Sequence, residues 1–126
     1  MRDLREDEVT FTIEALPEET PVEGNALASG EDEADRDCER EIIRALERGN
    51  EWAWCCVCVT ASWSALDGEE YTGCDFLGGC SYESAEDFKA AGGYFNDMKR
   101  AALDELNRKI AREIVRYTAL CKERES

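Results

Sequence analysis

The sequence has no histidine among its 126 residues. Histidine is the side chain that most often carries protons near neutral pH, and it commonly activates a cysteine or serine nucleophile. A thiolate nucleophile also needs a positive neighbourhood, whereas five of the seven cysteines lie between Arg48 and Lys89, where the chain has no basic residue. The sequence therefore predicts a protein that is not an enzyme, has no catalytic residue and takes no cofactor.

Positive charge is scarce along the whole chain. Acidic residues outnumber basic ones 30 to 15, which gives a net charge of −15. Direct contact with nucleic acid is not expected, because phosphate binding depends on Lys and Arg side chains that replace condensed counterions. An acidic surface serves solubility, and it also suits a basic host protein or nucleoprotein complex. The composition leaves both explanations open.

Long apolar runs are also absent. No stretch approaches the roughly 20 apolar residues of a membrane-spanning helix. Residues 1–5 (MRDLR) lead into acidic residues without the apolar segment of a secretory signal. Seven cysteines are an odd number, which fits reduced thiols in a cytoplasm better than complete disulfide pairing. We therefore expect a cytoplasmic protein with no membrane partner.

Residues 51–82 are the most distinctive stretch, because they hold all three tryptophans and five of the seven cysteines. From Glu51 the side chains divide into two faces with a period of two residues, which is typical of a strand. Residues 66–70 predict a turn, and residues 71–82 predict the returning strand of a hairpin. The more uniformly apolar face is assigned to the core: Ala53, Cys55, Val57, Val59, Ala61 and Trp63. The opposite face consists of Trp52, Trp54, Cys56, Cys58, Thr60 and Ser62.

The rest of the chain predicts one strand and three helices. Alternation predicts a strand over residues 8–14, and the turn-rich residues 15–30 predict a long loop. A helix with an acidic first turn is expected from about residue 31 to residue 48, and a short helix opens at Ser84. A last helix is expected over residues 94–124, with one apolar stripe: Met98, Ala102, Leu106, Ile110, Ile114, Tyr117 and Cys121.

These elements predict an α+β fold in which helices pack on one face of a three-stranded antiparallel or mixed sheet. The expected order is strand, helix, strand, strand, helix, helix. We expect a single domain over residues 1–126, with residues 1–7 flexible. A last helix of this length spans about 45 Å, more than so small a domain can cover. Its end is therefore expected to project, to fray or to pack on a second copy.

The cysteines allow two interpretations. Cys56 and Cys58 share one face of a strand, and Cys74 and Cys80 on the returning strand would face them, so four sulfurs suggest a zinc site. The spacing differs from the usual Cys-x₂₋₄-Cys turns, and cysteine is among the residues most often buried as a small apolar side chain. Buried thiols are therefore favoured and no metal ligand is assigned, with a zinc or thiol module kept as an alternative.

The two tryptophans of the second strand face also allow two interpretations. Trp52 and Trp54 are most simply core or sheet-covering residues, because large aromatic side chains dominate burial. If they are exposed beside acidic residues, they would form a binding hot spot. The core interpretation is favoured, and the hot spot stays open.

Four motifs occur together along the chain: TPVEGNALASG at residues 20–30, GNEWAW at 49–54, LGGCSY at 77–82 and GGYFNDM at 92–98. In this order they resemble a family of small uncharacterised acidic proteins of tailed bacteriophages and prophages. The resemblance covers nearly the whole chain and implies expression in the cytoplasm of an infected bacterial host. It brings no catalytic residues, and the family pattern does not depend on the cysteines of residues 55–74, which lowers the zinc interpretation.

A small acidic phage protein without catalytic apparatus suits inhibition of a host defence complex, of the anti-CRISPR or anti-restriction type. Carboxylates would then act as a nucleic-acid mimic on a basic surface. The expected partner-binding residues are Asp67, Glu69, Glu70, Asp75, Glu83, Glu86, Asp87, Glu31, Asp32, Glu33, Trp52 and Trp54. The alternatives are a self-associating structural or assembly accessory of a phage, forming a homodimer through the last helix or the Trp52 and Trp54 face, and the zinc or thiol module.

Overall fold

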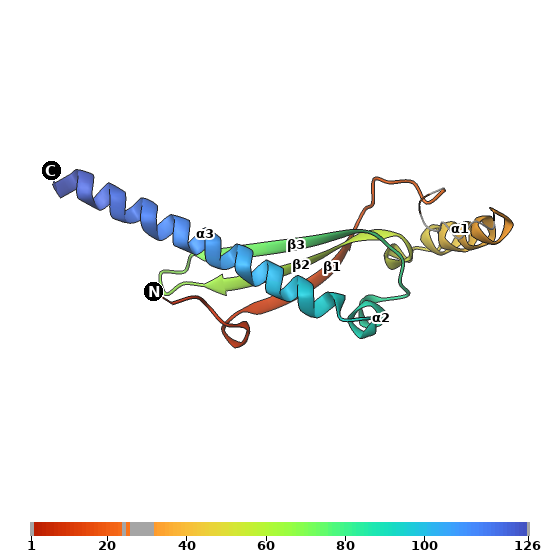
Figure 1. Ribbon diagram of the computed structural model, residues 1–126, viewed down its shortest axis with the longest axis horizontal. Coiled ribbons are helices and arrows are strands. Elements are labelled where there is room, and N and C mark those ends of the chain that lie inside the picture. The colour runs from red at the N-terminus through yellow and green to blue at the C-terminus, as the bar shows by residue number, and fades with distance from the viewer. Residues whose placement is uncertain (1, 24, 26–31, 126) are drawn as a thin grey trace. The chain divides into compact units, whose positions relative to one another are not determined.

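The computed structural model describes residues 2–23, 25 and 32–125, without the side chains of residue 32 and of residues 123–125. The chain is α+β, with a three-stranded antiparallel sheet in the order β1-β2-β3 and a long C-terminal helix (Figure 1). The elements in chain order are η1 (Glu6–Glu8), β1 (Thr10–Leu16), α1 (Asp32–Glu47), η2 (Glu51–Ala53), β2 (Cys55–Ser64), β3 (Glu70–Cys80), α2 (Ala85–Ala90) and α3 (Tyr94–Glu125), where η marks a short 3-10 helix. Among the described helices, none has the length and apolarity needed to cross a membrane.

The chain divides into two compact units, each made of segments that are distant in sequence. Unit 1 comprises Met1–Thr12, Val59–Asp75 and Asp97–Ser126, and unit 2 comprises Ile13–Cys58 and Phe76–Asn96. All three strands contribute residues to both units. That the chain is a single domain, and that all the helices share one face of the sheet, stay predictions.

Unit 1 is built on the close approach of α3 to β3. The first turns of α3 bury one stripe of the helix, whose members Met98, Ala102, Leu106 and Ile110 are at most 7% exposed. The helix backbone comes so near to β3 that only glycine fits at position 73. The predicted stripe is therefore confirmed as core as far as Ile110, whereas residues 111–120 are all exposed.

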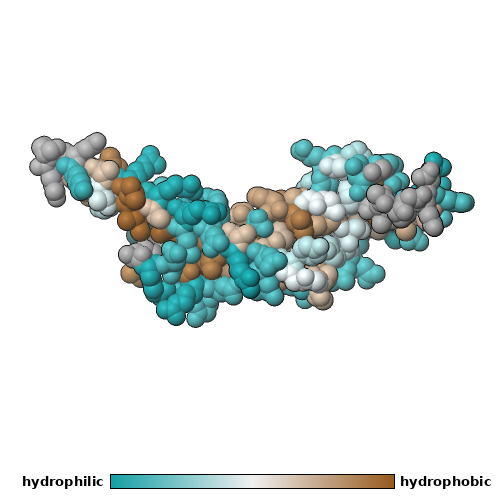
Figure 2. Space-filling model, in the orientation of Figure 1, coloured by the Kyte–Doolittle hydropathy of each residue, from teal (hydrophilic) through white to brown (hydrophobic). Residues whose placement is uncertain are grey.

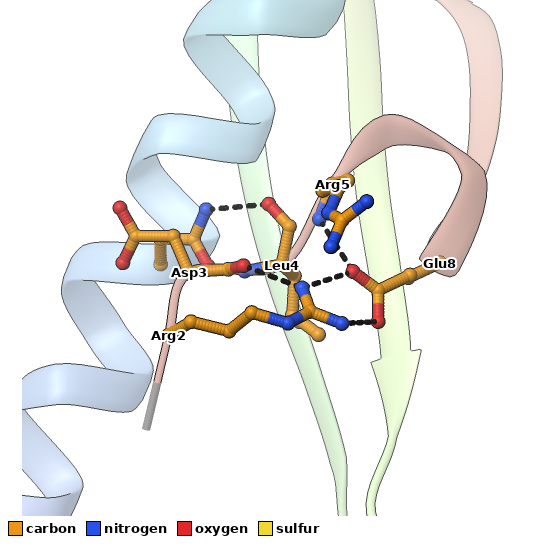
Figure 3. A network of polar contacts seen from close by, with 6 residues as sticks. Arg2, Asp3, Leu4, Arg5 and Glu8 are labelled. Atoms are coloured by element: carbon orange, nitrogen blue, oxygen red, sulfur yellow. Dashed lines mark hydrogen bonds and ion pairs between the residues drawn. The ribbon is translucent and has the colours of Figure 1, made fainter.

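The N-terminal segment is attached to this unit by polar contacts (Figure 3). The amide of Asn107 accepts a hydrogen bond from the Leu4 N–H at 2.9 Å and donates one to the Leu4 carbonyl at 3.2 Å. The Leu4 side chain is 8% exposed, and Arg2 forms an ion pair with Glu8 at 2.5 Å. Although residues 1–7 are predicted to be flexible, the structure places Leu4 in a buried, doubly hydrogen-bonded position.

In unit 2, β2 begins at Cys55, which is later than the sequence predicts. Residues 51–53 form η2 rather than the start of a strand, because the Asn50 side chain accepts a hydrogen bond from the Trp52 N–H at 3.2 Å and caps a turn. The predicted core face of β2 is otherwise confirmed, since Ala53, Cys55, Val57, Val59 and Ala61 are buried. Trp63 is the exception, because it is only half-buried.

The loop predicted for residues 15–30 lies partly outside the described residues. β1 extends to Leu16, and the described residues 17–23 and 25 contain neither helix nor strand. The Glu18 carboxylate accepts hydrogen bonds from the Gly79 N–H at 2.7 Å and the Thr20 N–H at 3.2 Å. These bonds hold the pKa of Glu18 below its ordinary value and join the start of the loop to the end of β3.

Candidate functional site

The turn between β2 and β3 presents a group of exposed carboxylates in unit 1. The turn closes through hydrogen bonds from the Ala65 N–H to the Glu69 carbonyl at 2.8 Å and from the Gly68 N–H to the Ala65 carbonyl at 3.0 Å. Gly68 has a φ of 89°, which glycine adopts without strain. Asp67 accepts a further bond from the Glu69 N–H at 3.0 Å. The turn therefore holds three predicted site residues at one place: Asp67, Glu69 and Glu70.

A groove of about 370 Å³ lies beside this turn, also in unit 1. Its aromatic wall is formed by Trp63 and Tyr71, whose rings stack at 6.0 Å between centroids and an angle of 29°. Because the two rings stack, both lie on the same side of the hairpin. The groove is lined by Trp63, Ala65, Asp67, Tyr71, Ile110, Glu113, Ile114 and Tyr117.

The electrostatics of the groove are negative. Burial raises the pKa of Tyr71, and the nearby carboxylates of Glu69, Asp67 and Glu113 raise it further, because a phenolate is repelled by negative charge. The lining residues include no Lys or Arg. This arrangement combines aromatic faces with carboxylates, which is a combination that attracts cationic side chains.

Lys109 contacts the same hairpin, but it does not neutralise the turn carboxylates. Its Nζ donates a hydrogen bond to the Thr72 carbonyl at 3.0 Å, and its ion-pair partner is Glu105 at 3.6 Å. Among the described residues, no ion pair involves a carboxylate of residues 59–75. This segment carries four acidic residues and no basic one, the fourth being Asp75, which is half-buried.

The other predicted acidic residues lie in unit 2, where two of them have structural partners. Glu86 forms an ion pair with Lys89 at 3.6 Å. Asp87 accepts a hydrogen bond from the Glu83 N–H at 3.1 Å, and its own N–H donates to the Ser84 hydroxyl at 3.2 Å, so it helps to cap α2.

The remaining acidic residues of the predicted set are Glu83, Glu33, Glu31 and Asp32. Glu83 and Glu33 are exposed, and Glu83 lines a shallow hollow of about 380 Å³ between η2 and α1. Glu31 and the side chain of Asp32 lie outside the described residues.

The two tryptophans of the predicted hot spot are held by the core of unit 2. Trp54 is 7% exposed, and its indole N–H donates a hydrogen bond to the Thr20 carbonyl at 2.7 Å. Trp52 is half-buried and lies 6.1 Å from the Phe88 ring, which also meets Tyr82 edge-on at 5.0 Å. The core interpretation is confirmed for Trp54, and its indole does not lie on an accessible surface. In unit 1, Trp63, which the alternation places on the core face, is half-buried beside Tyr71, and Tyr117 is exposed.

Three of the cysteines, Cys55, Cys58 and Cys80, are buried thiols, whereas Cys38 is exposed and Cys56, Cys74 and Cys121 are half-buried. Burial raises the pKa of Cys55 to about 12, with smaller contributions from Cys80 and Cys56, and burial also raises the pKa of Cys80. Cys74 contacts the Thr60 hydroxyl at 3.4 Å. Among the described residues, no three acidic, cysteine or histidine side chains form a group that could hold a metal ion.

The chain matches no protein-family model, no curated protein sequence and no solved structure.

Proposed function

We propose that this chain is a phage-encoded acidic binding protein that inhibits a host defence or nucleic-acid-handling complex, of the anti-CRISPR or anti-restriction type. In this role it acts without catalysis. Its carboxylates occupy a basic surface on which the host complex binds the phosphates of nucleic acid. The motif resemblance supports a phage origin, and the charge supports the mode of action.

One observation carries the proposal. The turn carboxylates and the aromatic groove lie together in unit 1. Residues 59–75 supply the turn carboxylates and the aromatic wall of the groove, and they include no basic residue. Asp67, Glu69 and Glu70 are exposed, and no described cation pairs with them. Solvated carboxylates that a protein leaves without a countercharge retain their full attraction for a cationic partner.

The groove adds selectivity to the charge. A guanidinium or ammonium group of the partner stacks on Trp63 or Tyr71 while its charge is matched by Asp67, and such contacts are worth about 0.5–2 kcal/mol each. The acidic residues of unit 2 form a separate candidate surface, on which Glu83 and Glu33 are exposed and Glu86 and Asp87 have partners within the protein. Association steered by charge is fast and weakens as salt increases.

The test is capture of partners from a bacterial lysate by the tagged full-length chain. The lysate is treated with nuclease so that nucleic acid cannot bridge two proteins, and the washes contain about 0.05 M or about 0.5 M salt. A basic nucleic-acid-handling protein should be retained at low salt, released at high salt and displaced by an added DNA or RNA oligonucleotide. Recovery of no such protein, or of one that binds equally well in the presence of the oligonucleotide, would contradict the proposal.

The alternative, a structural or assembly accessory of a phage, is favoured by one observation. The C-terminal half of α3 exposes several large apolar side chains, which is typical of a surface that another chain covers. The zinc or thiol module has no comparable support among the described residues. Elemental analysis of the purified protein tests it, since stoichiometric zinc would revive it.

A further inference from the structure

The C-terminal half of α3 is an exposed helix with an unusual share of apolar residues. We refer to residues 111–122 as the α3 tail. Residues 111–120 are all exposed, in contrast to the buried stripe that ends at Ile110. Four large apolar side chains of the tail are exposed, namely Ile114 by 44%, Val115 by 70%, Tyr117 by 71% and Leu120 by 54%. Figure 2 shows apolar side chains along this part of α3 among hydrophilic ones.

We propose that a second copy of this chain covers the α3 tail, and that the two tails pack antiparallel in a two-fold symmetric dimer. Covering a large apolar side chain stabilises an association by about 1.5–3 kcal/mol. The pairing would cover Ile114 and Tyr117, the two of these side chains that lie on the stripe, in each copy. This inference does not depend on binding to a basic host protein.

The helix pattern continues into the tail along the same line. Ile114, Tyr117 and Cys121 extend the stripe that Ile110 ends, with spacings of four, three and four residues. This sequence of spacings reads the same in both directions. Two antiparallel copies therefore align Ile114 with Tyr117 of the partner subunit, as a two-fold interface requires.

The charge of the tail identifies a second copy as its partner. Residues 111–122 contain three basic residues and one acidic residue, a net charge of +2 in a chain whose total is −15. In the same unit, residues 59–75 contain four acidic residues and no basic one. A second copy thus offers the acidic surface that a basic amphipathic helix needs, and the groove at Trp63 and Tyr71 lies beside that helix.

The overall charge does not prevent this pairing under physiological conditions. Two chains of net charge −15 repel each other at long range. At about 0.15 M salt the Debye length is about 8 Å, so the repulsion between distant carboxylates is largely screened. The contacts between the two tails are apolar, so they do not depend on the net charge of the chains.

The test measures the mass of the full-length chain by size-exclusion chromatography with light scattering, over about 1–100 µM protein at about 0.15 M salt. The wild-type protein should have twice the chain mass of 14.2 kDa at the highest concentration. Ile114→Glu with Tyr117→Glu should raise the dissociation constant by at least about 100-fold, because each buried carboxylate loses solvation. Val115→Glu is the matched control, since it lies about 100° from Ile114 around the helix and away from the stripe.

Three results would contradict the inference: a wild-type monomer at every concentration, an assembly larger than a dimer, and a dimer that Val115→Glu weakens as much as the stripe variant. Circular dichroism checks that each variant keeps its helix content. Tyr117→Ala provides a milder variant, because Tyr117 is 71% exposed and alanine favours helix. It should raise the dissociation constant by about tenfold and leave the melting temperature of the monomer unchanged.

Discussion

Gly73 of β3 lies so close to Leu106 of α3 that a Cβ atom at position 73 would overlap the Leu106 backbone nitrogen and the Ala102 carbonyl oxygen. The neighbouring atoms belong to a helix backbone, which cannot move aside as a flexible side chain can. This close approach holds α3 on the hairpin of unit 1. It therefore also positions the α3 side of the groove beside Trp63 and Tyr71.

Gly73→Ala should destabilise the protein by about 3 kcal/mol, because the added methyl group forces the helix away from the strand. The measurement is the free energy of unfolding in urea. Thr72→Ala, at the exposed neighbouring position, is the control and should cost less than about 1 kcal/mol. A Gly73→Ala variant as stable as the control would show that α3 does not pack as described.

Trp54→Phe should lower the free energy of unfolding by about 1–3 kcal/mol. The change removes the N–H that bonds to the Thr20 carbonyl at 2.7 Å and leaves space in the core of unit 2. The same measurement on Trp52→Phe should show a smaller loss, because Trp52 is half-buried. Equal stability of wild type and Trp54→Phe would contradict the assignment of Trp54 to the core.

The thiols should differ sharply in reactivity. Burial raises the pKa of Cys55 to about 12, so this side chain is protonated near neutral pH and shielded from reagents. Exposed Cys38 should be alkylated by iodoacetamide at pH 8 at least about 100-fold faster than Cys55, as measured by mass spectrometry of peptides. In urea the two rates should become similar. Rapid labelling of Cys55 in the native protein would be inconsistent with this assignment.

Acid should weaken the attachment of the N-terminal segment. The hydrogen bond and charge of Arg2, with the Arg5 N–H, lower the pKa of Glu8 from its ordinary value of 4.5 to about 2. Because the folded pKa is the lower one, the contribution of Glu8 to stability is complete above pH 4.5 and is lost as the pH falls from 4.5 to about 2.

Glu8→Gln removes this contribution, so the difference in unfolding free energy between wild type and variant should shrink over that range. Glu6→Gln, on the same 3-10 helix, is the control. A Glu8→Gln difference that stays constant from pH 6 to pH 2 would contradict the role of the Arg2–Glu8 pair.

Much of the fold could be predicted because the periodicities are strong. The alternation of β2 and the four-residue spacing of the α3 stripe identify core faces directly, and burial of Val57 and Leu106 confirms them. The boundary at residues 51–53 could not be predicted, since the Asn50 side chain caps a turn that the alternating pattern does not reveal. The attachment of Leu4 depends on Asn107, about a hundred positions away, and the local pattern of residues does not reveal such a contact.

The candidate site was only partly predictable. The absence of basic residues indicated an acidic surface, and the turn residues Asp67, Glu69 and Glu70 lie together as a turn requires. The groove beside Trp63 and Tyr71 could not be predicted, because alternation places Trp63 on the core face without showing where α3 stops covering it. The one available signal was that the α3 stripe continues past the length a small domain can bury.

The central claim is that the carboxylates of residues 67–75 bind a basic partner, and quantified capture from a nuclease-treated lysate tests it most directly. Two charge-reversal variants are compared, and each raises the net charge from −15 to −7. The site variant replaces the four acidic residues of the hairpin, Asp67, Glu69, Glu70 and Asp75, with lysine. The control variant replaces four exposed acidic residues elsewhere, Glu14, Glu19, Glu23 and Glu47, with lysine.

Circular dichroism establishes that both variants are folded before capture is compared. Recovery of the basic protein that wild type retains at low salt should fall at least about tenfold with the site variant, a loss of about 1.4 kcal/mol, and should fall much less with the control. Retention of that protein by the site variant, or equal losses with both variants, would contradict the claim, because binding would then depend on another surface or on net charge alone.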